Sequence, residues 1–501
     1  MFKEIPFSLD EINKYIDKNN HNVSTLTDLR EKLLKEKVDN NIEYKQDCSN
    51  YEEIYAMGDL HADYISFYKR LENFKLIDAP NKEDIDAADS KKIKIDIKNI
   101  DDCKSYLPIL TSNFEWIAEK KTLLVITGDI VDGRRDGNDI YDPFGSIELL
   151  LHMFLKNLKF KAREKGSDVI CIYGNHDMFL FFPLFEISDN KFLLQKYVHS
   201  RAILYFSDDV DKKYWVANGL YNRTQWLAPF YKNDFYFVFE LTHDKKTQIQ
   251  FVHGALHGKE NYSLYDDTIT LQNYFKSNFN DYFDKNKRKS LTDYLEEHVM
   301  GTEKQRKKRD DPMSAIWQRT YQNFEESDDK CNAKTFSFKN KGIFRDNWVE
   351  QEGPTITNGP TIIVGHCICA KQNYVHGQKE KNRMCIGGEC IYPKCFVNGI
   401  PRIVMVDTNM SSCFEKDYKD MRSVEILRIT KSNDNTDFPY FNNYESLYFD
   451  KNNAEIVSFK LTPDPDLKIK ELRKGGKISK KNSKKKKLRK KGKTRNIRKI
   501  P

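Results

Sequence analysis

A short apolar run that ends in glycine and three polar residues is the feature that most constrains the fold. Residues 169–173 read Val-Ile-Cys-Ile-Tyr, and Gly174, Asn175, His176 and Asp177 follow directly. Such a run predicts a buried strand whose carboxyl end delivers polar side chains to the edge of a sheet. Sites in open α/β sheets are built at this edge. A polar turn after a strand explains the tetrapeptide alone equally well, so the rest of the chain must decide.

Two earlier apolar runs, residues 52–57 and 122–127, end in a similar way. Each is followed by a glycine and then by potential metal ligands: Gly58, Asp59 and His61 after the first, and Gly128, Asp129 and Asp132 after the second. Apolar residues at helical spacing follow over residues 63–74 and 145–165. This threefold order of strand, polar site and helix predicts parallel β-α-β units, and therefore an α/β protein.

Later strand candidates at residues 248–252, 361–364 and 402–406 also run into polar residues. Together the first five strand ends offer carboxylate, amide and imidazole groups, in the chain order Asp59, His61, Asp129, Asn175, His253 and His366. A single histidine is more often structural than a ligand, but six ordered candidates at strand ends predict a dinuclear metal centre. Oxygen and imidazole ligands without thiolate suit Mn, Fe or Zn.

Charge is distributed unevenly along the chain. Residues 468–501 hold 18 Lys and Arg against one acid, Glu471, which leaves 65 basic and 74 acidic residues in 1–467. We expect this tail to be disordered, and to contact nucleic acid by charge alone or to act as a nuclear address. A solvated charge run without a partner is the plain alternative. The tail and the Lys-, Asn- and Ile-rich composition are also similar to proteins of large DNA viruses.

Neither a secretory signal nor a membrane span is expected. Residues 1–6 are charged, and no apolar run approaches 18 residues. Ten cysteines without such a signal predict reduced thiols in the cytoplasm or nucleus of a host cell, with a virion as the alternative location. Five cysteines lie within 29 residues but lack a repeated Cys-x-x-Cys, so free thiols are favoured over zinc: Cys367, Cys369, Cys385, Cys390 and Cys395.

Five sequence blocks resemble those of the calcineurin-like metallophosphoesterase superfamily. They read GDLHAD, GDIVDGRR, GNHD, HGALHG and GHCICA, and the resemblance spans about residues 50–412. Within the superfamily the chain is most similar to the phosphoprotein phosphatases and their bacterial-type relatives. The features in favour are Asp132, the segment 114–117, the absence of a second histidine in the last block, and VDTNMSS at residues 406–412.

The resemblance implies a sandwich of two mixed sheets flanked by helices, and roles for individual residues. Asp59 and His61 would hold one metal ion, Asp129 would bridge two ions, and the second ion would be completed by Asn175, His253 and His366. A water or hydroxide shared by the ions would attack phosphorus in line. His176 would protonate the leaving oxygen, with Asp132 holding its ring.

The arginines depart from the family pattern. Family members usually carry Arg directly after the second Asp of the second block, where this chain has Gly133. The phosphate-binding role therefore falls to Arg134 or Arg135, and the sequence leaves open which one. Arg319, in the segment IWQR, resembles a phosphate-binding arginine of the bacterial-type relatives. The alternative for Arg319 is an arginine on a helix surface beside a core tryptophan.

We expect an N-terminal extension over residues 1–46, a catalytic domain over 47–462 and a basic tail over 463–501. The catalytic domain is predicted to carry insertions at about residues 75–110, 179–245 and 259–311. The leading functional hypothesis is a metal-dependent phosphomonoesterase of the Ser/Thr phosphatase type, acting on phosphorylated protein. Two alternatives stay open: a nucleotide or RNA-end hydrolase like the diadenosine tetraphosphatases, and a non-catalytic binding or virion protein that retains the fold.

Overall fold

The structure is a computed structural model, and it describes residues 44–61, 63–78, 114–131, 134–135, 138–139, 146–180, 230–256, 264–282, 287–295, 298–299, 331–338, 348–356, 359–366, 374–375, 378–379, 391–397, 399–408, 425–431, 440–450 and 453–462. The predicted basic tail lies outside these ranges, and so does most of the predicted N-terminal extension. Among the described residues, no helix is long and apolar enough to cross a membrane.

The larger of the two main sheets has seven strands in the order β21-β20-β19-β2-β5-β8-β9. Four of its strands run parallel to one another: β2 (Glu53–Met57), β5 (Thr122–Ile126), β8 (Asp168–Ile172) and β9 (Phe235–Tyr236). Antiparallel pairing then adds β19 (Glu425–Lys431), β20 (Phe441–Asp450) and β21 (Glu455–Lys460). β2, β5 and β8 are buried at every position, as expected for parallel strands covered on both faces.

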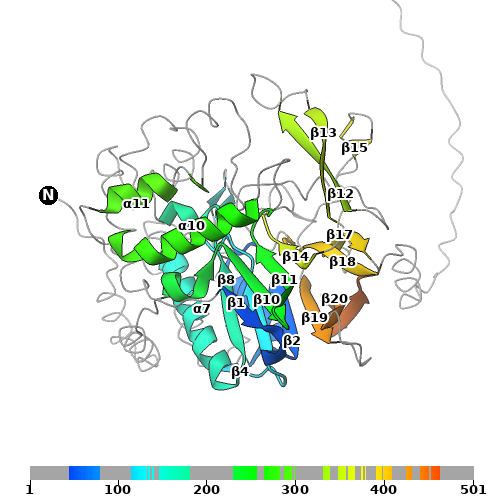
Figure 1. Ribbon diagram of the computed structural model, residues 1–501. Coiled ribbons are helices and arrows are strands. Elements are labelled where there is room, and N and C mark those ends of the chain that lie inside the picture. Colours follow the sequence, from blue (N-terminus) through cyan, green and yellow to red (C-terminus); the bar gives the residue numbers. More distant parts are fainter. Residues whose placement is uncertain are drawn as a thin grey trace, which may run out of the picture. The chain divides into compact units, whose positions relative to one another are not determined.

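The second main sheet has six strands in the order β1-β10-β11-β14-β18-β17. Its bounds are β1 (Lys45–Asp47), β10 (Val238–His243), β11 (Lys246–Val252), β14 (Thr361–Val364), β18 (Ile400–Met405) and β17 (Tyr392–Val397). β11, β14 and β18 are parallel, and β1 is parallel to β10, whereas β10 pairs antiparallel with β11 and β17 pairs antiparallel with β18. Both main sheets are therefore mixed, and Figure 1 shows them as the body of the molecule.

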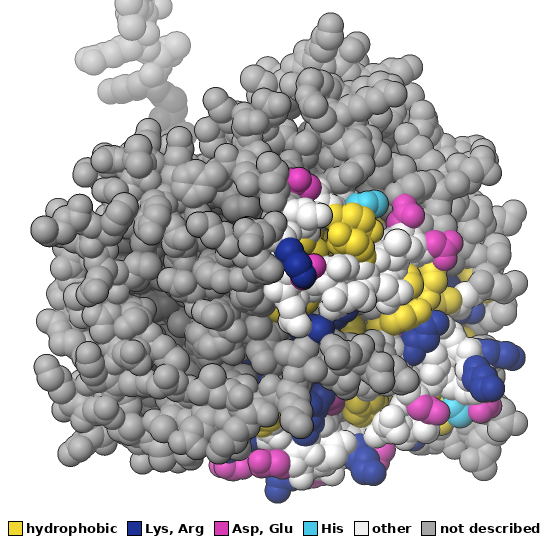
Figure 2. Space-filling model, turned by 60° about the vertical axis from the view of Figure 1, so that its left-hand side comes forward, with side chains coloured by type: hydrophobic (Ala, Val, Ile, Leu, Met, Phe, Trp, Pro, Cys, Tyr) yellow, Lys and Arg dark blue, Asp and Glu magenta, His cyan; other side chains and the backbone are white. Residues whose placement is uncertain are grey.

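One hydrophobic core joins the two sheets. Ile54, Val125 and Ile170 from the seven-stranded sheet belong to the same buried cluster as Phe251 and Ile363 from the six-stranded sheet. Burying these faces against each other is what makes the arrangement a sandwich. Ile117 and Ile456 are the only exposed large hydrophobic side chains among the described residues, and the described surface in Figure 2 mixes acidic, basic and small apolar areas.

Helices cover the sheets and follow the predicted polar strand ends. Asp63 caps α3 (Tyr64–Asn73) by accepting a hydrogen bond from the Ser66 N–H at 3.0 Å. α7 (Ser146–Glu164) packs along β8, and α10 (Leu264–Asn278) packs against β10 (Figure 1). The remaining helical elements are η1 (Cys48–Asn50), η2 (Asp177–Leu180), η3 (Phe279–Tyr282) and α11 (Arg288–Leu295).

Four two-stranded ribbons complete the described elements. They pair β3 (Ile77–Asp78) with β4 (Glu115–Trp116), β6 (Arg134–Arg135) with β7 (Asn138–Asp139), β12 (Cys331–Phe338) with β13 (Trp348–Ile356), and β15 (Tyr374–Val375) with β16 (Gln378–Lys379).

Three sequence expectations differ from the structure. Residues 179–245 were expected to form an irregular insertion, but β9 and β10 lie within them. Their buried positions are consecutive, so these strands lack the alternation of apolar and polar residues that marks a half-buried strand. β1 begins at Lys45, inside the expected N-terminal extension. Cys395 is disulfide-bonded, so the expectation of free thiols is wrong for this residue, although Cys48 and Cys171 are free.

Candidate metal centre

Parallel strands from both sheets deliver the candidate ligands to one edge of the sandwich. Asp59 and His61 follow β2, Asp129 follows β5, Asn175 follows β8, His253 follows β11 and His366 follows β14. All six residues are buried, and so are His176 and Asp177. The carboxyl ends of parallel strands meet at a common edge, which is why residues far apart in the sequence lie together here.

The first group of ligand atoms surrounds one side of Asp129. The Nε2 atoms of His61 and His176 lie 3.8 and 3.7 Å from Asp129 Oδ2. His61 Nε2 also lies 3.9 Å from Asp59 Oδ2. The rings of His61 and His176 meet edge to face, with their centroids 5.0 Å apart. These atoms converge closely enough for one cation to bind between them.

The second group lies on the other side of the same carboxylate. His253 Nε2 is 3.3 Å from Asp129 Oδ1 and 3.0 Å from Asn175 Oδ1. The His253 and His366 rings have centroids 4.8 Å apart. The second group thus consists of Asp129, His253 and His366, and Asp129 belongs to both groups. The shared carboxylate is the arrangement that a bridge between two ions requires.

The hydrogen bonds of His253 leave an atom suited to a cation. Its Nδ1 lies 2.7 Å from the Thr127 carbonyl oxygen, which can only accept, so Nδ1 carries a proton. In the neutral ring the lone pair therefore sits on Nε2, which faces the oxygens of Asn175 and Asp129. Three electron-pair donors that point at one another fit a bound cation, and a carbonyl contact of this kind also orients metal-binding histidines.

Like charges are concentrated in the centre. Burial, and then the negative charge of Asp407, raise the pKa of Asp59 well above its usual range. Burial and the charge of Asp129 raise the pKa of Asp177 to about 7. Burial lowers the pKa of His253, but Asp129 and Asp59 outweigh it and raise the pKa to about 10. The cluster draws in positive charge, and divalent ions fit this requirement.

The backbone of the centre is held in a restricted conformation. His61, Asp129 and His366 have φ angles of 42°, 48° and 60°, in the left-handed region. A Cβ atom added to Gly174 would lie 2.2 Å from the Asp129 side-chain oxygen Oδ1, so only glycine fits there. His366 N–H donates to Asp59 Oδ1 at 3.1 Å, which links the two sheets at this edge.

Asp177 has a role that the sequence did not reveal. Its Oδ1 accepts hydrogen bonds from the N–H groups of Ile130 and Val131, at 2.8 and 3.2 Å. Its Oδ2 accepts one from the Gly174 N–H at 2.8 Å. The side chain therefore fastens the loop after β5 to the loop after β8. The last residue of the GNHD block was the available signal, but sequence alone assigns it no partner.

Asp407 is a second addition to the predicted set. It follows β18, it is buried, and its charge acts on Asp59. The Asp407 Cα lies 2.4 Å from the position that a Cβ of Gly58 would occupy, so Gly58 allows the two loops to touch. The motif at 406–412 was the sequence signal for this residue.

Four predicted site residues remain untested by this geometry. Asp132 and Arg319 lie outside the described residues. Arg134 and Arg135 form β6, but their side chains are not among those described. The roles predicted for these four residues stay predictions, as do the ligand roles of the six clustered residues and the role of His176.

One comparison with known proteins shows the family to which this fold and this centre belong. The family model for calcineurin-like phosphoesterases matches residues 53–322, more than half of the chain. The chain therefore belongs to the calcineurin-like phosphoesterase family. The predicted superfamily and the predicted α/β sandwich of two mixed sheets are confirmed. As a member of this family, the chain is a metal-dependent phosphoester hydrolase.

Solved structures of low similarity were also found. One is the cold-active protein-tyrosine phosphatase of a psychrophile, Shewanella sp., with 14% identity, a TM-score of 0.38, and coverage of 84% of this chain and 83% of that chain. Another is a structure of cold-active protein tyrosine phosphatase at 1.1 Å, with 14% identity, a TM-score of 0.36, and coverage of 84% and 81%. No curated protein matches the chain.

Proposed function

We propose that this chain is a phosphoprotein phosphatase-like enzyme that hydrolyses phosphate monoesters with two divalent ions, Mn, Fe or Zn. The observation that carries the proposal is the position of Asp129. Its two oxygens face two separate groups of imidazole nitrogens, His61 with His176 and His253 with His366. A phosphomonoester needs strong neutralisation of its phosphoryl charge, and paired ions supply this together with an activated water.

Each candidate ligand has a place in this scheme. Asp59 and His61 would hold one ion, and Asn175, His253 and His366 would hold the other, with Asp129 shared. The donors are carboxylate, amide oxygen and imidazole, a set that suits Mn, Fe or Zn. Asp177 is a positioning residue, because its three backbone hydrogen bonds hold Asp129 and Asn175 on adjoining loops.

His176 is the proposed proton donor to the leaving oxygen. Its backbone N–H donates to Asp129 Oδ1 at 2.9 Å, so its main chain is fastened to the shared carboxylate. Its ring lies beside His61, with Nε2 directed toward the centre. A positioned imidazole can protonate an alkoxide leaving group as the bond to phosphorus breaks.

The phosphoprotein specificity is supported by one feature of the late chain. The motif that resembles the phosphoprotein phosphatases includes Asp407 and Thr408, both of which are buried. Asp407 acts electrostatically on Asp59, and Thr408 accepts a hydrogen bond from Arg70 at 3.2 Å. The motif thus lies beside the metal centre, which supports a role for it in an active site of the phosphoprotein phosphatase type.

The test is metal-dependent hydrolysis measured on three substrate classes. The purified full chain is stripped with a chelator and assayed on a generic aryl phosphate, before and after Mn, Fe(II) or Zn is restored. The active form is then compared on Ser- and Thr-phosphopeptides, dinucleoside polyphosphates and capped RNA. We expect activity to return with metal and to favour the phosphopeptides.

Two results would contradict the proposal at different levels. Full aryl phosphatase activity in the metal-free protein would contradict the metal-dependent mechanism. Preference for dinucleoside polyphosphates or capped RNA would keep the mechanism and replace the substrate class with a nucleotide. Metal binding without hydrolysis of any of these substrates would favour a binding protein.

A further inference from the structure

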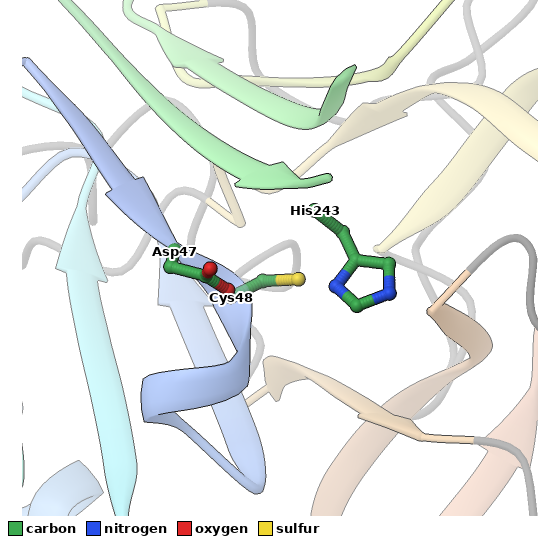
Figure 3. A group of neighbouring side chains, drawn as sticks. All are labelled: Asp47, Cys48 and His243. Carbon is green, nitrogen blue, oxygen red and sulfur yellow. The ribbon is translucent and has the colours of Figure 1, made fainter. Parts of the chain in front are cut away.

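A second group of potential metal ligands lies away from the phosphoesterase centre. It consists of Asp47, Cys48 and His243, whose ligand atoms all lie within 4.8 Å of one another. Figure 3 shows the Cys48 sulfur pointing toward the His243 ring, with the Asp47 carboxylate close to Cys48. We call these three residues the Cys48 cluster.

Strand pairing brings the members of the Cys48 cluster together. β1 pairs in parallel with β10, and Asp47 lies opposite Thr242 in the register. The next residue along each strand, Cys48 and His243, is therefore delivered to the same end of the sheet. Residues remote in sequence meet here because of backbone hydrogen bonding, which is independent of the three side chains.

The backbone on both sides of the cluster is well defined. Asp244 and Lys245 have φ angles of 48° and 64° and form a two-residue turn between β10 and β11. This turn places His243 as the last residue of its strand. On the other side, Asp47 Oδ1 accepts a hydrogen bond from the Ser49 N–H at 2.8 Å and caps η1.

The side chains retain atoms that can bind an ion. The ring of His243 packs on Tyr440 with a centroid distance of 4.5 Å, and its side chain is 24% exposed. Its Nε2 faces Asp244 Oδ2 at 3.7 Å, so the other nitrogen, Nδ1, is the one directed at the cysteine (Figure 3). Asp47 uses Oδ1 for the cap, and a carboxylate has a second oxygen with further lone pairs.

We propose that Asp47, Cys48 and His243 form a site for one zinc ion, separate from the phosphoesterase centre. A thiolate, an imidazole and a carboxylate are zinc ligands, and their two negative charges balance Zn²⁺. Ligands about 2.0–2.3 Å from zinc lie roughly 3.3–3.8 Å apart in a tetrahedron. The observed spacing, within 4.8 Å, is wider than this range, so a bound ion would draw the three side chains closer, and water would complete the tetrahedron.

The position of the site indicates a structural role. β11 starts at Lys246, next to the turn that follows His243, and ends at Val252, next to His253 of the phosphoesterase centre. At about 3.3 Å per residue the two sites are roughly 20 Å apart, too far for shared chemistry. β1 is an edge strand of three residues, so a bound ion would fasten this short strand to β10.

Cobalt(II) is the probe that separates this site from the phosphoesterase centre. Cobalt bound to a thiolate has a charge-transfer absorption in the near ultraviolet, and none of the described residues of the phosphoesterase centre is a cysteine. We expect the full chain, kept reduced, to show this absorption on cobalt titration and to lose it when zinc is added. Cys48→Ala should abolish the absorption, whereas Cys171→Ala, which removes the other cysteine that is free among the described residues, should retain it.

Two further variants test the other ligands. Asp47→Asn keeps an oxygen for the η1 cap, so it removes the charged ligand with little change to the turn. His243→Asn removes the imidazole at a partly exposed position. Each should weaken cobalt binding by at least about tenfold, because even outer-shell partners of a metal contribute 10–100-fold. Both should leave turnover on aryl phosphate unchanged.

The cobalt titrations can support or overturn the proposed zinc site. Absence of the absorption in the unaltered chain overturns the proposal, and so does its persistence in Cys48→Ala. Unchanged cobalt affinity in Asp47→Asn or His243→Asn overturns the three-ligand set. If Cys48→Ala fails to fold by circular dichroism, the two other variants decide. The cobalt titrations do not depend on phosphatase activity, so they test this site whether or not the proposed function is correct.

Discussion

Two groups of mostly buried charged side chains in this molecule differ in their charge balance. One is a network between α7, β8 and the residue before β9: Lys156, Lys159, Arg163, Asp168 and Asp234. Lys156 lies 2.6 Å from Asp234, and Lys159 lies 2.6 Å from Asp168 and 3.3 Å from Asp234. Arg163 adds a contact of 3.1 Å to Asp168. We call this group the α7 network.

The phosphoesterase centre has the opposite balance. In the α7 network, burial opposes ionisation of Asp234, but Lys159 and Lys156 outweigh it and lower its pKa. In the centre, burial and Asp407 raise the pKa of Asp59 instead, while the charges of His176 and His253 outweigh burial and lower the pKa of Asp129. The α7 network is complete without any added ion, whereas the centre holds carboxylate beside carboxylate. Asp59 and Asp234 thus differ in the sign of the charge that faces them, and we expect this difference between a site for cations and a self-contained network of ion pairs.

The largest expected effect comes from changing one carboxylate of the centre. Asp59→Asn keeps the oxygen that accepts the His366 N–H but removes a charge that faces Asp407. Turnover on aryl phosphate should fall at least about 10³-fold, because several kcal/mol of metal-derived stabilisation are lost. The free energy of unfolding of the metal-free protein should stay the same or rise. A clear loss of metal-free stability would mean that the centre is a structural cluster too.

A second variant separates proton donation from ion binding within the centre. If His176 is the proton donor, His176→Asn should lower turnover by about 10²–10⁴-fold with both ions retained. The loss should shrink for aryl phosphates, whose leaving groups need little protonation, relative to alkyl phosphates. Metal content is measured alongside the kinetics. Loss of an ion would reassign His176 as a ligand, which its distance of 3.7 Å to Asp129 would permit.

An aspartate-to-asparagine substitution in the α7 network should lower the stability of the folded chain. Asp234→Asn leaves the buried ammonium groups of Lys156 and Lys159 short of a carboxylate. Breaking a buried ion pair from one side costs about 3–5 kcal/mol, so the free energy of unfolding should fall by that amount in urea titrations. Turnover per folded molecule should not change. Equal stability of the variant and the unaltered chain would remove the contrast between the two groups.

The smallest expected effect is the pH dependence of the stability difference between Asp234→Asn and the unaltered chain. Because the pKa of Asp234 is lowered by folding, its contribution to stability is complete above the usual aspartate pKa of 3.8. The contribution is lost as the pH falls through the folded pKa, since folding then opposes protonation. The stability gap between Asp234→Asn and the unaltered chain should be constant from pH 7 to pH 5 and shrink below pH 3.8. Urea unfolding at these pH values measures it.

Much of the arrangement around the centre was predictable from local patterns. The apolar run at 122–127 became β5, and the helical spacing at 145–165 became α7, because period and glycine boundaries are local signals. The rule that sites lie at the carboxyl ends of parallel strands then brings Asp59, Asp129 and His253 together.

The features that escaped prediction are those set by long-range contacts. Asp177 binds N–H groups of a loop that lies almost fifty positions earlier, and Asp407 approaches Asp59 through the close packing at Gly58. No local sequence pattern indicates the partners of Asp177 or of Asp407. Likewise, β10 is buried at its first four positions, so it lacks the alternation by which a strand is recognised.

The left-handed backbone at His61, Asp129 and His366 has a consequence for the history of such a chain. An L-residue in this region costs roughly 1–2 kcal/mol relative to glycine, although Asp and His tolerate it better than most. In a copy of the gene that is no longer selected for catalysis, substitution of these three residues by Gly or Asn would stabilise the protein. Selection for catalysis would instead keep His61, Asp129 and His366 in place despite the cost of their backbone conformation.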